Sequence, residues 1–243
     1  MTTTGVGLEL ELALDQRVEA ARTETGLGAT DDAGHRGDDL IGDLRAARRP
    51  RLVVISGPSG VGKDTVIEDL RGRFPDAYFA VTATTRPRRP GEMDGVHYFF
   101  LDDDAFNARR ADAEFLESAE VYGFQYGVPR GPIRAALERG QDVFVKVDIQ
   151  GAAAIRALVE HASFIFLAPE SMAELMRRLH ARKTDDPEAL MKRFGTASRE
   201  LSAAREFDYV VFNETGRTER TVDQIAAIVA SEHCRTRQPD VAL

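Results

Sequence analysis

The sequence predicts an α/β fold of three layers, in which helices cover both faces of a mostly parallel central sheet. From residue 51 onward, short apolar runs typical of buried strands alternate with longer segments of helical pattern. The first apolar run, Leu52-Val53-Val54-Ile55, leads into a glycine-rich turn and then into a helical segment. Because ligands in such folds bind beyond the carboxyl ends of the strands, this turn is the first candidate for a functional site.

Each element follows from the local residue pattern. Apolar and aromatic residues, which are favoured in strands, predict extended segments at residues 52–56, 78–82, 97–100, 114–121, 143–147, 164–167 and 209–212. The segments between them have helical periodicity and predict helices at residues 63–72, 103–110, 130–139, 151–160, 171–182, 187–206 and 218–232. Gly140 follows the helix at 130–139 and is a common helix stop.

Residues 1–48 differ from the rest of the chain, because stretches of them contain little apolar sequence. We expect them to form a disordered or weakly helical extension, with a short helix near residues 8–22 and a disordered linker at residues 23–38. The folded domain is expected to span residues 49–233, and residues 234–243 to form a flexible tail. We assign no chemistry to the extension.

Composition argues against several classes of protein. The formal net charge of −8 over 243 residues argues against a general nucleic-acid binder. No apolar run reaches the length of about 18 residues that a membrane span needs, and the N-terminus lacks a secretory signal pattern. Cys234 is the only cysteine, so neither an intrachain disulfide nor a cysteine zinc cluster can form. We therefore expect a cytoplasmic protein that binds neither nucleic acid nor membrane.

The most informative segment, residues 57–65, fits the G-x-x-x-x-G-K pattern of a phosphate-binding P-loop. Backbone N–H groups and the helix N-terminus attract an anion there, and Lys63 reaches the β- and γ-phosphates of a nucleotide. Asp64 departs from the pattern, because Ser or Thr normally offers magnesium a hydroxyl at this position; it is a candidate metal ligand. A Gly-Lys pair also occurs in ordinary surface turns, but the strand before and the helix after favour the P-loop. The residues assigned to ATP binding here are Gly57, Pro58, Ser59, Gly60, Val61, Gly62, Lys63, Asp64 and Thr65.

A second feature is an arginine-rich loop at residues 84–92, in which two prolines and a glycine prevent a regular helix. The loop displays Arg86, Arg88 and Arg89, whose guanidinium groups can pair bidentately with phosphate. The alternative is a solvated basic turn. A further basic cluster at residues 177–183 could likewise be a solvated helix surface.

In their order along the chain, these motifs resemble those of the guanylate kinase family. They are GPSGVGK at 57–63, TTRPRRPGE at 84–92, GVHYFF at 95–100, EFLESAEVYGFQYG at 114–127, DIQG at 148–151 and an arginine-bearing segment at 177–193. The resemblance implies the P-loop NTPase fold, with a GMP-binding insert near residues 84–130 and a mobile lid near 177–193. It also implies phosphoryl transfer from ATP to GMP or dGMP with Mg²⁺, by a monomer or a homodimer.

The resemblance also implies roles for single residues. Arg86, Arg89 and Tyr98 would hold the phosphate of GMP, with Tyr126 beside them. The Glu117 carboxylate would accept from the N1–H and amino group of guanine, two adjacent donors that adenine lacks. Thr82 and Asp148 would lie near the guanine. The remaining implied residues are Arg178, Arg182 and Arg193, which would close over the phosphates and act in catalysis with Lys63 and Arg86, and Asn213 near the adenine.

Alternatives exist for two of these roles. Glu117 could be an ordinary surface acid on an edge strand. Asn213 could be a turn residue at a strand end.

The chain departs from the family pattern at Asp64, at Lys146, where the family has an acid, at Val128, where it has Ser or Thr, and at Lys183, where it has Gly. Residue 146 ends a central strand and residue 64 begins the P-loop helix, so the two should lie close together. We therefore expect either an Asp64–Lys146 ion pair or magnesium ligation by Asp64. Val128 removes one hydrogen bond to guanine.

Two other functions fit parts of the sequence. A related P-loop kinase acting on ribose 1,5-bisphosphate also carries Asp after the P-loop lysine, but it is expected to lack Tyr98, Glu117 and Tyr126. A catalytically inactive guanylate-kinase-like binding module typically loses the P-loop, whereas Lys63 and its glycines remain here.

Overall fold

The structure is a computed structural model that describes residues 30–46, 49–121, 123–180, 187–236, 239, 241 and 243. The side chains of residues 30–35, 45–46 and 187–193 lie outside this description. The chain divides into two units, Met1–Arg48 and Arg49–Leu243.

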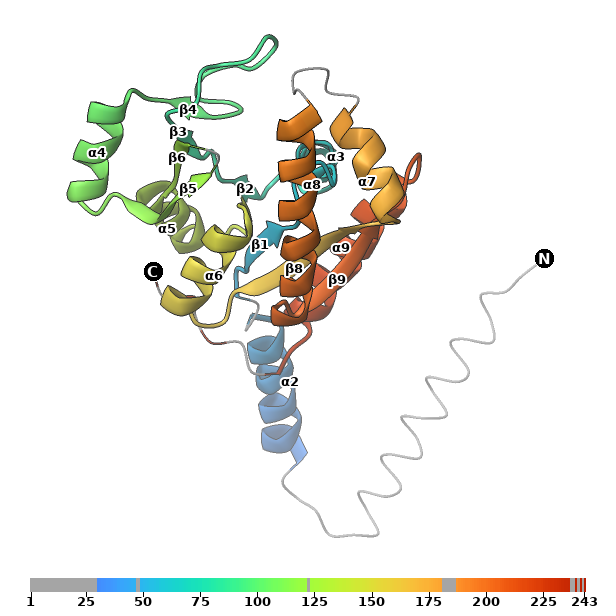
Figure 1. The fold of residues 1–243 in the computed structure, drawn as a ribbon. Coiled ribbons are helices and arrows are strands. Elements are labelled where there is room, and N and C mark those ends of the chain that lie inside the picture. Colours follow the sequence, from blue (N-terminus) through green and yellow to red (C-terminus); the bar gives the residue numbers. More distant parts are fainter. Residues whose placement is uncertain are drawn as a thin grey trace. The chain divides into compact units, whose positions relative to one another are not determined.

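The first unit contains helix α2, Thr30–Ala46 (Figure 1). The disordered linker predicted at 23–38 is therefore wrong from residue 30 onward. Leu40, Ile41 and Leu44 recur at helical spacing, but three residues in a mostly polar stretch are a weak signal. All three side chains are exposed. The helix predicted at residues 8–22 lies outside the described residues.

The second unit is built on a five-stranded parallel sheet in the order β2-β7-β1-β8-β9. Its strands are β1 Leu52–Ser56, β2 Tyr78–Phe79, β7 Val143–Lys146, β8 Ser163–Pro169 and β9 Tyr209–Asn213. The mostly parallel sheet predicted from the sequence is confirmed. In the register of the two central strands, Ile55 pairs with Lys146, so β1 and β7 end side by side.

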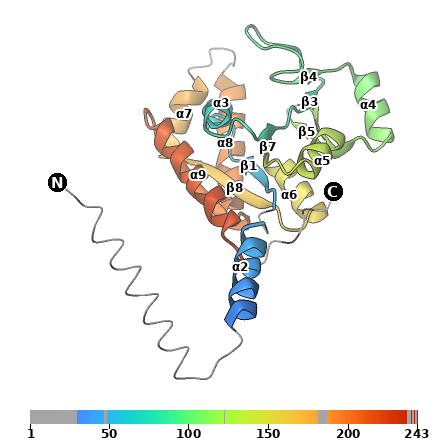
Figure 2. The ribbon, with the colours of Figure 1, turned by 180° about the vertical axis from the view of Figure 1, so that it is seen from behind.

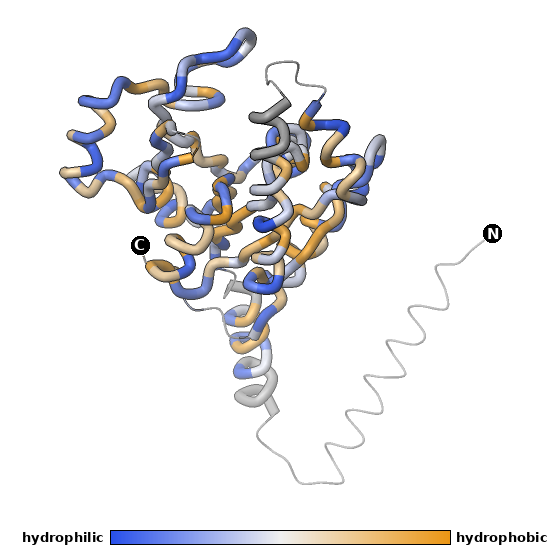
Figure 3. The backbone as a smooth tube through the Cα atoms, in the orientation of Figure 1, coloured by the Kyte–Doolittle hydropathy of each residue, from blue (hydrophilic) through white to orange (hydrophobic). Residues whose placement is uncertain are grey.

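Helices cover both faces of this sheet (Figures 1 and 2). Leu52 and Val54 pack on one face against α5, Arg130–Glu138, and α6, Ile149–Leu158. Val53 and Ile55 pack on the other face against α3, Lys63–Arg73, and α9, Thr218–His233. The alternation follows from the two-residue period of a strand buried on both sides. Figure 3 shows the apolar colouring gathered on these central strands.

Three further elements complete the main body: α7, Met172–His180; α8, Pro187–Ser202; and the 3-10 helix η1, Ala203–Glu206. α7 and α8 pack together through Leu175, Leu179 and Ala197. No helix among the described residues combines the length and the apolar character needed to cross a membrane.

A smaller four-stranded sheet, in the order β4-β3-β6-β5, lies beside the main one (Figure 1). It consists of β3 Ala83–Thr84, β4 Phe99–Phe100, β5 Phe115–Val121 and β6 Phe124–Pro129, with α4, Asp103–Ala111, between β4 and β5. The strand expected at 78–82 is shorter, and β6 was not predicted. Gly127 weakens the strand pattern of β6 in the sequence, because glycine is unfavourable inside strands. The glycine is needed there, since a Cβ would lie 2.9 Å from the Phe115 ring.

Candidate active site

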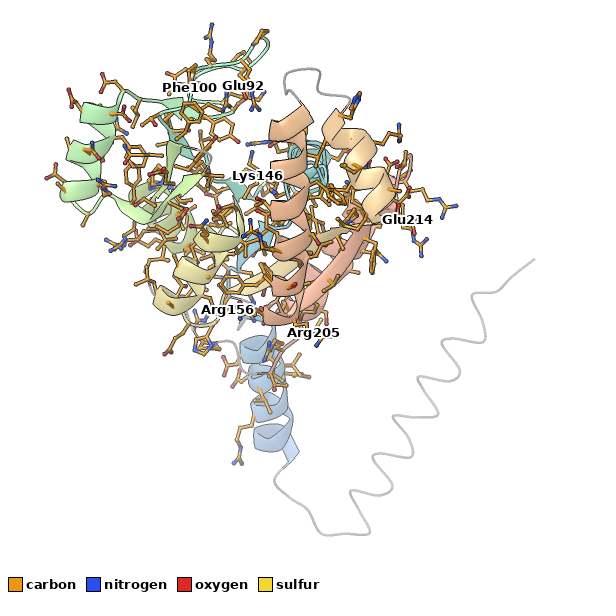
Figure 4. All side chains as sticks on the ribbon, viewed as in Figure 1. Glu92, Phe100, Lys146, Arg156, Arg205 and Glu214 are labelled. Carbon is orange, nitrogen blue, oxygen red and sulfur yellow. The ribbon has the colours of Figure 1, made fainter. Side chains whose placement is uncertain are left out.

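A cavity of about 590 Å³ lies where β1 and β7 end, and both sheets contribute to its walls. The P-loop, the β5–β6 hairpin, the end of β7 and α8 all line it. Figure 4 labels Lys146 in the space between the smaller sheet and α8. The cavity therefore lies at the carboxyl edge of the parallel strands, as predicted from the sequence.

The P-loop turns tightly after β1. Gly57 has a φ of 147°, and a Cβ there would lie 2.3 Å from the Leu167 carbonyl oxygen. Lys63 Nζ donates to the carbonyl oxygens of Gly57 at 2.5 Å and Pro58 at 3.2 Å. Burial lowers the pKa of Lys63 to about 8. The P-loop residues that line the cavity are Gly57, Ser59, Gly60, Gly62, Lys63 and Asp64, whereas Pro58, Val61 and Thr65 lie outside its lining.

Glu117 faces the cavity from β5 and is 7% exposed. Its Oε2 atom is buried and has no hydrogen-bond partner among the described residues. Burial and the nearby Asp148 carboxylate raise the pKa of Glu117 to about 8. A buried carboxyl oxygen without a partner is costly, so this position is suited to a ligand that donates hydrogen bonds.

Two neighbours frame Glu117. Asp148 caps α6 by accepting from the Gly151 N–H at 2.8 Å, and burial raises the pKa of its carboxyl group. Val128 pairs with Glu117 across the hairpin and is fully buried. Thr82 also lines the cavity, ahead of β3.

The residues predicted to hold the GMP phosphate divide into two groups. Arg89, Tyr98 and Tyr126 line the cavity. Arg86 is not among the lining residues, and its guanidinium carbon lies 5.3 Å from the centre of the Tyr98 ring. The Arg86 guanidinium donates to Glu92 Oε1 at 2.7 Å and to the Pro87 carbonyl oxygen at 2.6 Å. Burial opposes the charge of Arg86, but the hydrogen bond to Glu92 raises its pKa.

Asp64 and Lys146 form the ion pair that was one of the two predicted alternatives. Lys146 Nζ lies 2.5 Å from Asp64 Oδ1 and 3.2 Å from the Tyr98 hydroxyl. Within the described residues, no group of three or more acidic, histidine or cysteine side chains could hold a metal ion. A metal here would depend on Asp64 and on oxygens of the substrate.

The structure does not bring all the predicted lid and adenine residues to the cavity. Arg178 donates to the Val61 carbonyl oxygen at 3.0 Å and to Glu174 Oε1 at 2.7 Å. Asn213 Nδ2 also donates to the Val61 carbonyl oxygen, at 2.8 Å, so both residues hold the P-loop at this one carbonyl group. Arg182 lies outside the described residues, as does the side chain of Arg193.

Sequence reasoning missed Glu200, which reaches the cavity from α8. Its Oε2 accepts from the Ser59 N–H at 3.3 Å, and burial raises its pKa although Lys63 acts in the opposite direction. Its position in the sequence gives no signal, because only the packing of α8 places it beside the P-loop.

Comparison with known proteins decides the family. A model of the guanylate kinase family matches residues 49–232. The chain belongs to the guanylate kinase family. The resemblance seen in the motifs is thus confirmed, and the match lies wholly within the second unit.

Individual family members agree with this. The guanylate kinase of Thermobifida fusca is 46% identical over 181 residues, which cover 74% of this chain and 91% of that protein. The guanylate kinase of Streptomyces kasugaensis is 48% identical over 165 residues, covering 68% and 80% of the two chains. The crystal structure of guanylate kinase from Anaplasma phagocytophilum is 32% identical, with a TM-score of 0.64 and coverage of 78% and 89%.

Proposed function

We propose that this protein transfers the terminal phosphoryl group of ATP to GMP, and to dGMP, in the cytoplasm. The single observation that supports this most strongly is the Glu117 carboxyl group, buried in the same cavity as Lys63 and without a hydrogen-bond partner on Oε2 among the described residues. Guanine presents two adjacent donors, and an ionised carboxylate offers the matching pair of acceptors. Adenine presents the opposite pattern at this edge, so Glu117 would select GMP over AMP.

The reaction requires little covalent chemistry from side chains of the protein. A phosphate oxygen of GMP attacks the γ-phosphorus of ATP, the bond from that phosphorus to the bridging oxygen breaks, and ADP leaves. Because the attacking oxygen is already an anion, no general base is needed. Lys63 and Arg89, which line the cavity, would neutralise and orient the phosphates, which accounts for most of the rate effect in phosphoryl transfer. Arg86 and Arg178 would have to leave their present partners to join them, and the same role for Arg182 and Arg193 stays a prediction from the sequence.

Magnesium would enter with ATP. Mg²⁺ is commonly bound by one or two carboxylates together with substrate phosphates, and the 72% exposed Asp64 carboxylate suits that role, although Lys146 competes for it. Bound there, the ion would neutralise charge on the transferring phosphoryl group.

A coupled assay of ADP release tests this function. The acceptors are GMP, dGMP, AMP and ribose 1,5-bisphosphate, each with ATP and Mg²⁺. We expect turnover with GMP and dGMP, and its loss in a Lys63→Ala variant. Turnover with ribose 1,5-bisphosphate alone would support the related kinase instead. Turnover with no acceptor would contradict the proposal and favour a binding module.

A further inference from the structure

Lys146 joins the two halves of the cavity. It ends β7, beside the P-loop that follows β1. Its ammonium contacts Asp64 in the first turn of α3 on one side and the Tyr98 hydroxyl on the other. The Lys146 nitrogen also lies 4.8 Å from the centre of the Tyr98 ring, within reach of a cation–π interaction. A single cation therefore touches both the ATP side and the proposed GMP side.

This ammonium is mostly buried, because the Lys146 side chain is only 18% exposed. Burial opposes the charge, but Tyr98 and Asp64 hold the pKa of Lys146 above its ordinary value. A second cation shares the cavity, since Lys63 also lines it and the charge of Lys146 acts to lower the pKa of Lys63. Two ammonium groups repel each other, and an anion that contacts both of them relieves that repulsion.

We propose that Lys146 binds the phosphate of the acceptor nucleotide, and that Asp64 holds the ammonium in the cavity until this phosphate arrives. The inference rests on the proposed function, because it assumes that a nucleoside monophosphate occupies the Tyr98 side of the cavity. Tyr98 and Arg89 line the same cavity as Lys146, so a phosphate dianion bound there could meet an ammonium, a guanidinium and a hydroxyl.

Exchange of partners is favourable for a physical reason. Asp64 is 72% exposed, so water hydrates its carboxylate when Lys146 leaves it. Lys146 is mostly buried and gains more from a dianion held between several donors than from one exposed carboxylate. Asp64 therefore competes with the acceptor phosphate, and its removal should strengthen acceptor binding.

The experiment is a calorimetric titration of the full chain with GMP and with guanosine, in EDTA and without ATP. The ratio of the two affinities isolates the contribution of the phosphate. We expect Lys146→Met to weaken GMP binding by about tenfold or more and to leave guanosine binding unchanged. Lys146→Arg, which keeps the charge, should give a ratio of GMP to guanosine affinity between those of the parent chain and Lys146→Met. Asp64→Asn should tighten GMP binding, and should have no effect when Lys146→Met is also present.

Arg220→Met is the matched control, because Arg220 is an exposed cation on α9 that pairs with Glu214 away from the cavity. It should leave both affinities unchanged. The inference is overturned if Lys146→Met keeps the parent ratio of the two affinities, whether both stay unchanged or both weaken equally. It is also overturned if Asp64→Asn changes GMP affinity equally with and without Lys146. Failure of the proposed function looks different: in an added titration with AMP, the parent chain would bind GMP no better than AMP.

Discussion

Gly151 and Glu117 are in direct contact: a Cβ atom on Gly151 would lie 3.1 Å from the Glu117 carboxyl carbon and 3.0 Å from the Cβ of Val147. Gly151 is in the first turn of α6, and its N–H bonds to Asp148. The absence of a side chain at residue 151 thus lets the helix approach the Glu117 carboxyl group. The DIQG segment of the sequence therefore sets the position of the carboxyl group that we propose selects the base.

Gly151→Ala should displace Glu117. The added methyl group meets Val147, just after β7, and the Glu117 carboxyl group, and both residues are buried. We therefore expect a higher KM for GMP and little change in the KM for ATP. Gly72→Ala in α3 is the control, because no atom of the described residues lies within 4 Å of a Cβ there. Steady-state kinetics against each nucleotide measure both variants. Equal changes in the two KM values would contradict the assigned role of this contact.

GMP binding should release a proton at pH 7. The pKa of Glu117 is raised to about 8, so its carboxyl group is mostly protonated in the free protein, whereas the ionised form accepts both donors of guanine. Calorimetry in PIPES and in Tris, which differ in ionisation enthalpy, measures the release. We expect close to one proton for the parent chain. The Glu117→Gln variant measures the proton release or uptake that comes from the GMP phosphate itself. An equal release from both proteins would exclude Glu117 as the source of the proton.

The Glu117 carboxyl group should also make the free energy of unfolding depend on pH. The folded-state pKa of Glu117, about 8, exceeds the ordinary value of 4.5 that applies in the unfolded chain. Its contribution to stability is therefore fully present below pH 4.5 and is lost as the pH rises through 8. Relative to Glu117→Gln, the parent chain should lose a few kcal/mol of unfolding free energy between about pH 4.5 and 8. Urea unfolding at pH 5.5 and 8.5 checks this; a constant difference between the two proteins would refute it.

Asn213 should act through the P-loop. Its side-chain Nδ2 donates to the Val61 carbonyl oxygen, and its side-chain Oδ1 accepts from the Thr221 hydroxyl. The residue is 4% exposed. Asn213→Ala should therefore lower the unfolding free energy by about 2 kcal/mol and leave the preference for ATP over GTP unchanged. Denaturant melts and donor competition measure the two effects. A variant as stable as the parent chain that no longer prefers ATP over GTP would show instead that Asn213 recognises the adenine.

Some of this site was predictable from the sequence because it depends on local order along the chain. A strand, a glycine-rich turn and a helix place Lys63, and the ends of adjacent parallel strands bring residue 146 to residue 64. Other features depend on packing between distant segments. Arg178 and Asn213 both donate to the Val61 carbonyl oxygen, and Glu200 reaches Ser59 from α8. No local pattern encodes those contacts.

The most direct test of the central claim is the ratio of kcat/KM for GMP to kcat/KM for AMP, in the parent chain and in Glu117→Gln. Base selection by Glu117 requires a strong preference for GMP in the parent chain. It also requires a fall of about a hundredfold in the variant, since two charge-assisted hydrogen bonds to the base are weakened. A variant that keeps the parent ratio would show that the base is recognised elsewhere.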